Sequence, residues 1–180
     1  MSNRYLTTKK MALIAILGCV QYVSFMSFSF IPYLEVITSI TVCFAMVFST
    51  RDAFLGSLIF GSVYLLTTGI TPWGSMYFFI YPAYSLIIGA TRPILKRHFL
   101  ILCLVSGLFS FATGQLLQLP FIIFSKQVTL LYMLLGLQVS LGQFALTFCF
   151  MFLTYRRFEA VLTYLNKKLF PNCIKTKKTF

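Results

Sequence analysis

The chain has 180 residues, of which 59% are hydrophobic and only 10% charged, and its mean hydropathy is +0.89. A soluble domain carries roughly a quarter charged residues, and so short a chain cannot bury this apolar content in one core. The composition excludes an ordinary soluble domain and predicts an all-α integral membrane protein. The net charge of +12 does not indicate nucleic-acid binding, because no basic stripe follows a polar face.

The charged residues divide the chain into apolar segments that six membrane-spanning helices would fill. A span needs about 20 apolar residues, or about 17 at the short end. We expect one membrane domain, residues 1–180, with spans at about 11–29, 34–50, 53–68, 73–91, 99–119 and 129–155. The first segment is too long for the apolar region of a signal peptide and lacks a small-residue cleavage site, which favours an uncleaved helix.

A basic tail, 156–180, follows the sixth span. Its apolar residues recur at helical spacing: Phe158, Val161, Leu162, Leu165 and Leu169. This pattern fits an amphipathic helix on the cytoplasmic membrane surface, and it fits a plain extension of the sixth span equally well.

The positions of the basic residues predict the orientation of the chain. With the N-terminus inside, 14 of the 15 Lys and Arg residues fall in inner segments, and only Lys126 lies outside. Because cytoplasmic segments of membrane proteins are rich in Lys and Arg, both termini are expected to be cytoplasmic. The outer connections are then 30–34, 68–73 and 120–128.

Catalytic motifs are missing from the sequence. There is no H-E-x-x-H, G-x-S-x-G or phosphate-binding glycine loop, and the five cysteines and single His98 form no ligand cluster. We therefore expect no enzyme activity, no metal and no cofactor. Of the three acidic residues, only Glu35 lies near membrane depth, where a carboxylate is either functional or simply interfacial.

Aromatic and amide side chains gather in the outer halves of the later spans. Residues at positions 73, 77, 81 and 84 share one helical face, and this stripe continues below headgroup depth. Core packing and interhelical hydrogen bonds explain each residue alone. Together they predict an outward-opening binding pocket made by Tyr33, Glu35, Trp73, Tyr77, Tyr81, Gln115, Gln118 and Gln138.

Small residues mark one face of the first span. Ala12, Ala15 and Cys19 would allow another helix to approach closely, either within this chain or from a separate subunit.

Two segments, "IPYLEVITSITVCFAMVFSTRDAFLGSLIFG" and "GITPWGSMYFFIYPAYSLIIGATRP", are similar to the second to fourth helices of a known family. The chain resembles the substrate-binding S component of energy-coupling factor (ECF) vitamin transporters over most of residues 9–157. The family contacts its partner through an A-x-x-x-A pattern on the first span. The nearest match here is Ala15 followed by Cys19.

The resemblance implies a function in the cell membrane of a prokaryote. The S component binds a small water-soluble vitamin outside and topples against a membrane T subunit that carries two cytoplasmic ATPases. The connections 30–34 and 68–73 would gate the pocket, and Ala12, Ala15 and Cys19 would contact the T subunit. Pantothenate and hydroxymethylpyrimidine are the expected ligands. The alternative is a structural or assembly membrane protein whose aromatic and amide residues serve only packing.

Overall fold

The computed structural model describes residues 8–31, 33 and 35–169, and the described part of the chain is helical without strands. The helices are α1 (Thr8–Phe28), α2 (Val36–Val47), α3 (Thr50–Thr68), α4 (Pro72–Arg97), α5 (Phe99–Leu116), the 3₁₀ segment η1 (Leu119–Ile123) and α6 (Lys126–Leu169). Four segments of this part are long and apolar enough to cross a membrane: α1, α4, α5 together with η1, and α6. The prediction of an all-α protein with helices suited to a membrane is confirmed.

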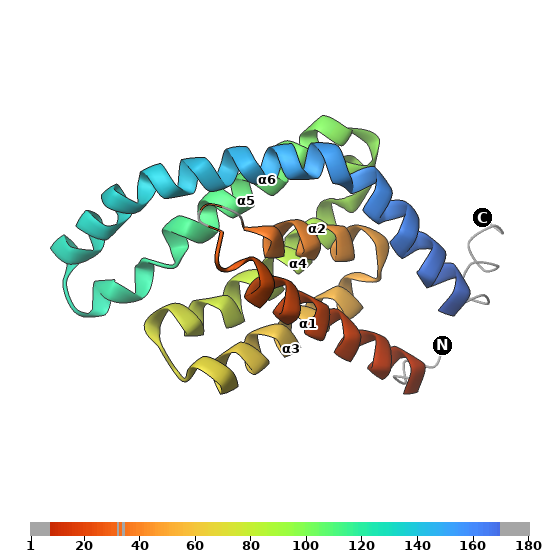
Figure 1. The fold of residues 1–180 in the computed structure, drawn as a ribbon, viewed down its shortest axis with the longest axis horizontal. Helices are drawn as coiled ribbons and strands as arrows, with labels where there is room; N and C mark the ends of the chain where they lie inside the picture. Colours follow the sequence, from red (N-terminus) through yellow and green to blue (C-terminus); the bar gives the residue numbers. More distant parts are fainter. Residues whose placement is uncertain (1–7, 32, 34, 170–180) are drawn as a thin grey trace.

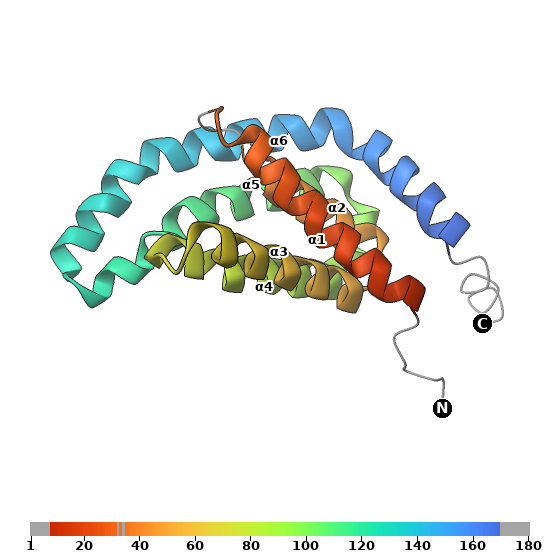
Figure 2. The ribbon, with the colours of Figure 1, turned by 60° about the horizontal axis from the view of Figure 1, so that its bottom comes forward.

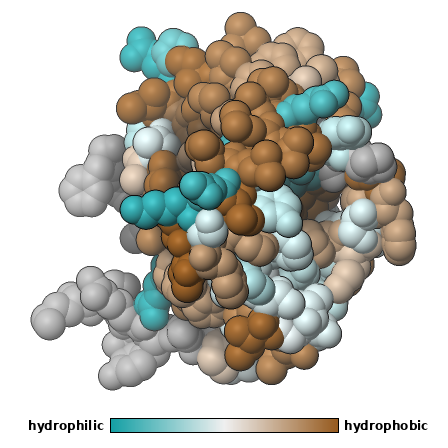
Figure 3. All heavy atoms as spheres, turned by 90° about the vertical axis from the view of Figure 1, so that its left-hand side faces the viewer, coloured by the Kyte–Doolittle hydropathy of each residue, from teal (hydrophilic) through white to brown (hydrophobic). Residues whose placement is uncertain are grey.

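The helices run back and forth between two ends of the molecule. The connections α1–α2, α3–α4 and α5–α6 point toward one end, whereas the start of α1, the end of α6 and the connections α2–α3 and α4–α5 point toward the other (Figures 1 and 2). Figure 3 looks onto the first of these ends, where hydrophobic residues cover much of the surface and strongly hydrophilic ones are few and scattered. Successive helices therefore alternate in direction along the described part of the chain.

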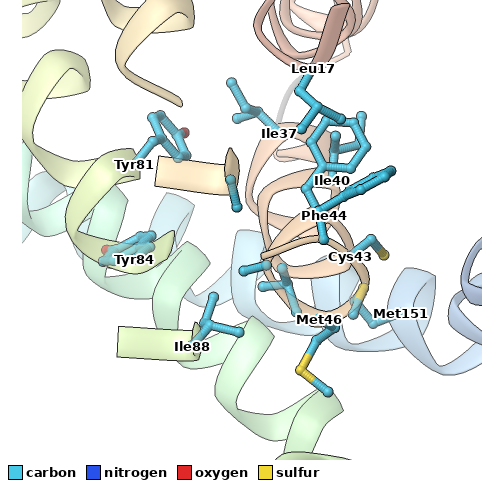
Figure 4. Packing of buried hydrophobic residues seen from close by; sticks show 14 of the residues in the cluster. Leu17, Ile37, Ile40, Cys43, Phe44, Met46, Tyr81, Tyr84, Ile88 and Met151 are labelled. Atoms are coloured by element: carbon cyan, nitrogen blue, oxygen red, sulfur yellow. The ribbon is translucent and has the colours of Figure 1, made fainter. Parts of the chain in front are cut away.

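Helix α2 is the centre of the bundle. Every residue from Val36 to Met46 is buried, and the helix contacts α1, α3, α4, α5 and α6. Figure 4 shows Ile40 and Phe44 on the side of Leu17 of α1, while Tyr81, Tyr84 and Ile88 follow one another along α4. A helix surrounded by protein is apolar on all sides, which explains why α2 has no polar face.

Helix α2 is shorter than the predicted span 34–50. It has 12 residues, so it is about 18 Å long and does not reach across a hydrocarbon layer of about 30 Å. The chain is extended at Phe48 and Ser49, where the Ser49 hydroxyl accepts a hydrogen bond from the Asp52 backbone amide and begins α3. The uncharged run between Glu35 and Arg51 thus includes connection residues as well as helix.

Two other helices extend beyond their predicted ends. Helix α4 continues through Pro93 to Arg97, whereas the predicted fourth span ends at 91. Two contacts favour this continuation: Leu95 is buried in the core, and the Arg92 side chain donates hydrogen bonds to the Met46 carbonyl at the end of α2. Helix α6 has 44 residues, about 66 Å, and arches over the bundle without a break (Figures 1 and 2).

The described part of the predicted tail, 156–169, is therefore a continuation of α6. Its residues Phe158, Leu162 and Leu165 form one wall of an apolar groove of about 670 Å³. Helix α1 forms the opposite wall, and α2 forms the floor. The rest of the tail, 170–180, lies outside the described residues.

Candidate functional site

A cavity of about 260 Å³ lies beneath the connection between α1 and α2. Its lining comes from the end of α1, from this connection, from the start of α2 and from α4, α5 and α6. Four of the predicted pocket residues line it: Tyr33, Glu35, Tyr77 and Tyr81. The size is at the small end of the range for ligand sites, which suits a single-ring metabolite.

Glu35 is the hydrogen-bonding centre of the cavity. It immediately precedes α2, and its side chain turns into the bundle. The Oε1 atom accepts hydrogen bonds from the Thr38 hydroxyl at 2.8 Å and from the Tyr81 hydroxyl at 2.7 Å. The Oε2 atom accepts one from the Ser110 hydroxyl at 2.5 Å. Three hydroxyl donors on α2, α4 and α5 thus fix the position of the Glu35 carboxyl group.

The donor direction at Ser110 is set by a further hydroxyl. Thr147 of α6 donates to the Ser110 oxygen at 2.9 Å, so the single proton of Ser110 is directed to Glu35. Both Ser110 and Thr147 are buried. The network therefore joins α5 and α6 to the carboxylate and holds it in one orientation.

Aromatic rings form one wall of the cavity. Tyr77 and Tyr81 lie one helical turn apart on α4, and their rings are parallel, with centroids 5.7 Å apart. Phe25 of α1 meets Tyr77 edge-on at 5.4 Å, and Phe60 of α3 meets Tyr81 edge-on at the same distance. These contacts fix the positions of the Tyr77 and Tyr81 rings.

Tyr33 lies in the connection that covers the cavity. Its ring packs on Gly142 of α6, where a Cβ atom would lie 2.9 Å from Tyr33 Cδ1. Its backbone φ of 68° is in the left-handed region, which is unusual for a residue other than glycine, asparagine or aspartate. Strained backbone of this kind often occurs at ligand clamps and switches. Pro32 and Leu34, its neighbours, lie outside the described residues.

The other predicted pocket residues do not line the cavity. Trp73 is 47% exposed, and its ring packs against Phe121 of η1 at 5.2 Å. Gln115 donates a hydrogen bond to the Ser140 hydroxyl at 2.8 Å, which links α5 to α6. Gln118 has a buried Oε1 atom without a hydrogen-bond partner, and Gln138 is exposed. The inward face of α6 therefore includes Ser140 and Thr147 but not Gln138.

Sequence reasoning missed Gln143 of α6 as a pocket residue. It lines the cavity, and its Oε1 atom is buried without a hydrogen-bond partner among the described residues. Thr113 of α5 and Phe25 of α1 also line the cavity and were not predicted. The spacing of Gln143 and Thr147, one helical turn, was the available signal for a shared inward face.

A second polar cluster crosses the bundle. The Gln21 amide nitrogen donates to Thr41 at 2.8 Å and to Ser57 at 3.1 Å, and the Ser57 and Ser85 hydroxyls are 2.9 Å apart. All four side chains are buried. They join α1, α2, α3 and α4, and we regard them as structural because they do not line the cavity.

The small residues predicted as a subunit contact are accessible. Ala12, Ala15 and Cys19 are all exposed on α1. The described residues contain no group of three or more His, Cys, Asp or Glu side chains that could hold a metal ion.

The cavity therefore combines one carboxyl group, hydroxyls, an amide and aromatic rings, which are groups that can hold a small molecule. Comparisons with protein-family models, with curated proteins and with solved structures give no match for this chain.

Proposed function

We propose that this chain is the substrate-binding S component of an ECF-type importer. It captures a small water-soluble vitamin or vitamin precursor outside a prokaryotic plasma membrane. It then delivers this ligand by toppling against a membrane T subunit, and two cytoplasmic ATPase subunits supply the energy. The observation that carries the proposal is the cavity beneath the α1–α2 connection, where Tyr33, Glu35, Tyr77 and Tyr81 meet.

Of the two gating connections that the resemblance implies, the first borders this cavity. Tyr33, in the first connection, covers part of the cavity and rests on Gly142 of α6. The second connection precedes α4, and Trp73 at its end packs on Phe121 next to the α5–α6 turn. A movement of the first connection would change access to Glu35, which supports a site that opens and closes.

The proposal is tested by isothermal titration calorimetry of the purified full-length chain against a panel of B vitamins and their precursors. We expect one compound to bind with a Kd in the micromolar range or below. Calorimetry is preferred to tryptophan fluorescence as a measure of binding. Trp73 does not line the cavity, so its emission is not expected to change when a ligand binds. If no compound of the panel binds, the proposal is wrong, and the structural or assembly function becomes the better account.

A second measurement addresses the partners. The tagged protein, expressed in its native membrane and extracted gently, should co-purify with one membrane subunit and two ATPase subunits. Recovery of the chain without partner subunits, under conditions that keep a known ECF complex intact, would argue against the importer.

A further inference from the structure

We propose that the cavity selects a flat, amino-substituted nitrogen heterocycle that is neutral or cationic, and that it rejects vitamins that carry a carboxylate. The proposal deepens the transport function and rests on it. It restricts the two expected ligands, because hydroxymethylpyrimidine belongs to the accepted class and pantothenate belongs to the rejected one.

The electrostatic argument starts from Glu35. Three hydroxyl groups donate hydrogen bonds to its carboxyl oxygens, so these oxygens are fixed as acceptors at the cavity. The described residues that line the cavity include no Lys, Arg or His. A second carboxylate entering this cavity would lose its hydration and meet the acceptor oxygens of Glu35 without a cation to pair with. An anionic ligand is therefore disfavoured.

The hydrogen-bonding argument concerns acceptors that have no donor. A carboxylate offers about four acceptor positions, and the hydroxyls of Thr38, Tyr81 and Ser110 occupy three. The position that remains is on Oε2, which accepts only from Ser110 among the described hydrogen bonds. The Gln143 Oε1 atom in the same cavity has no hydrogen-bond partner among the residues that the structure describes. The ligand must therefore bring donors, such as the N–H groups of an amino-substituted ring.

The position of Gln143 relative to Glu35 follows from α6. Thr147 lies one turn after Gln143 on the same face, and Thr147 is joined to Glu35 through Ser110. Gly114 of α5 leaves room for the amide, since a Cβ atom there would lie 2.8 Å from Gln143 Oε1. Both free acceptors therefore border the same region of the cavity, so that one ligand ring with two donors can reach them.

The shape argument comes from the aromatic wall. The partly buried rings of Tyr77 and Phe25 line the cavity, with the fully buried Tyr81 ring packed against Tyr77, and they favour a flat ligand. The electron-rich faces of these rings also attract a cation. Ring faces, free acceptors and the carboxylate thus favour the same chemical class.

The test is calorimetric titration of the full-length protein with two groups of probes. The first group contains thiamin, hydroxymethylpyrimidine and pyridoxamine, and the second contains pantothenate, biotin and nicotinate. We expect the best ligand to come from the first group, with at least tenfold tighter binding than any member of the second. An anionic probe that binds as tightly as the best amine overturns the inference but leaves the importer intact. Binding of no probe in either group overturns the inference, and binding of no compound in the wider panel of B vitamins and precursors overturns the importer as well.

Three variants connect the selectivity to its cause. Glu35→Gln replaces the carboxyl group by an amide of nearly the same shape. We expect it to lower the affinity for the amine about 10- to 100-fold and to reduce the discrimination against pantothenate. Glu159→Gln is the matched control, since Glu159 lines a separate pocket with Tyr155, and it should leave both affinities unchanged.

Gln143→Leu covers the case in which Glu35→Gln does not fold. This variant should lower the affinity for the amine. It should preserve the preference for amines over anions, because Glu35 remains. If neither cavity variant changes the affinity of a bound amine, the assignment of these acceptors to the ligand is wrong.

Discussion

Gly114 lies where α5 passes closest to the polar side chains of α6. A Cβ atom at this position would lie 2.4 Å from the Ser140 hydroxyl and 2.8 Å from Gln143 Oε1. Ser140 also accepts a hydrogen bond from Gln115 and donates one to the Gly136 carbonyl. A methyl group here would therefore displace a hydroxyl that two hydrogen bonds hold in place.

We expect Gly114→Ala to destabilise the protein by about 1–3 kcal/mol, because overpacking forces side chains away from their preferred positions. It should also weaken ligand binding through Gln143. Gly136→Ala on α6 is the matched control: the nearest atom to its Cβ would be 3.9 Å away, so the variant should be neutral or slightly stabilising. Thermal unfolding in detergent measures the stability of the two variants. Equal melting temperatures for the two variants would contradict the close packing described at Gly114.

At the residue scale, part of the site could be predicted from the sequence. Glu35 was the only acid near membrane depth, and the four-residue spacing of Tyr77 and Tyr81 placed both rings on one face. The sequence does not show which of Gln138 and Gln143 faces the bundle, because the inward face of a long helix depends on its curvature. The hydroxyls of Ser110 and Thr147 gave no signal, since such residues in membrane helices commonly bond to their own backbone.

At the scale of the elements, α1 presents two different faces. Gly18 and Gly56 bring α1 and α3 close together, and a Cβ atom on Gly56 would lie 2.9 Å from Leu17 Cβ. Another face carries the exposed residues Ala12, Ala15 and Cys19. The first face is used within the chain, so the second remains available for the proposed T subunit.

We expect Ala15→Trp to reduce co-purification of the T subunit, because a bulky ring prevents close approach of another helix at a small-residue face. Leu100→Trp on α5 is the control, since Leu100 is 60% exposed on a different helix. Binding of a vitamin by the isolated variant should be unchanged. Normal recovery of the complex with Ala15→Trp would move the contact away from this face.

The helix boundaries show which features of the sequence were decisive. Glycine and proline at residues 69–72 mark the α3–α4 connection, but length alone overestimates α2 because Phe48 and Ser49 are uncharged yet extended. Proline was read as the end of the fourth span, whereas burial of Leu95 and the hydrogen bonds of Arg92 to α2 favour continuation of α4. Tertiary contacts of this kind are not visible in one sequence.

At the scale of the whole molecule, the proposed topology makes the two ends distinguishable. Ile70, in the α3–α4 connection, is 91% exposed and lies toward the end assigned to the outside (Figure 1). Lys167 is in the last turn of α6, at the opposite end. Fourteen of the 15 basic residues fall in segments assigned to the inside.

We expect the cysteine introduced by Ile70→Cys to react with a membrane-impermeant maleimide in intact cells. The cysteine introduced by Lys167→Cys should react only after the cells are permeabilised, because the positive-inside rule places this end in the cytoplasm. The native cysteines are replaced by serine in both proteins to remove the background. Labelling of Lys167→Cys in intact cells would reverse the proposed orientation.

The shortness of α2 brings the Glu35 carboxylate deep into the bundle. Its partner Tyr81 lies nine residues after the start of α4, about 13 Å along the helix, which is nearly half of a hydrocarbon layer of about 30 Å. A bound monovalent cation would therefore experience about half of the transmembrane voltage, or about 1 kcal/mol per 100 mV. In proteoliposomes, an inside-negative potential should tighten the binding of a cationic vitamin severalfold and leave a neutral one unaffected.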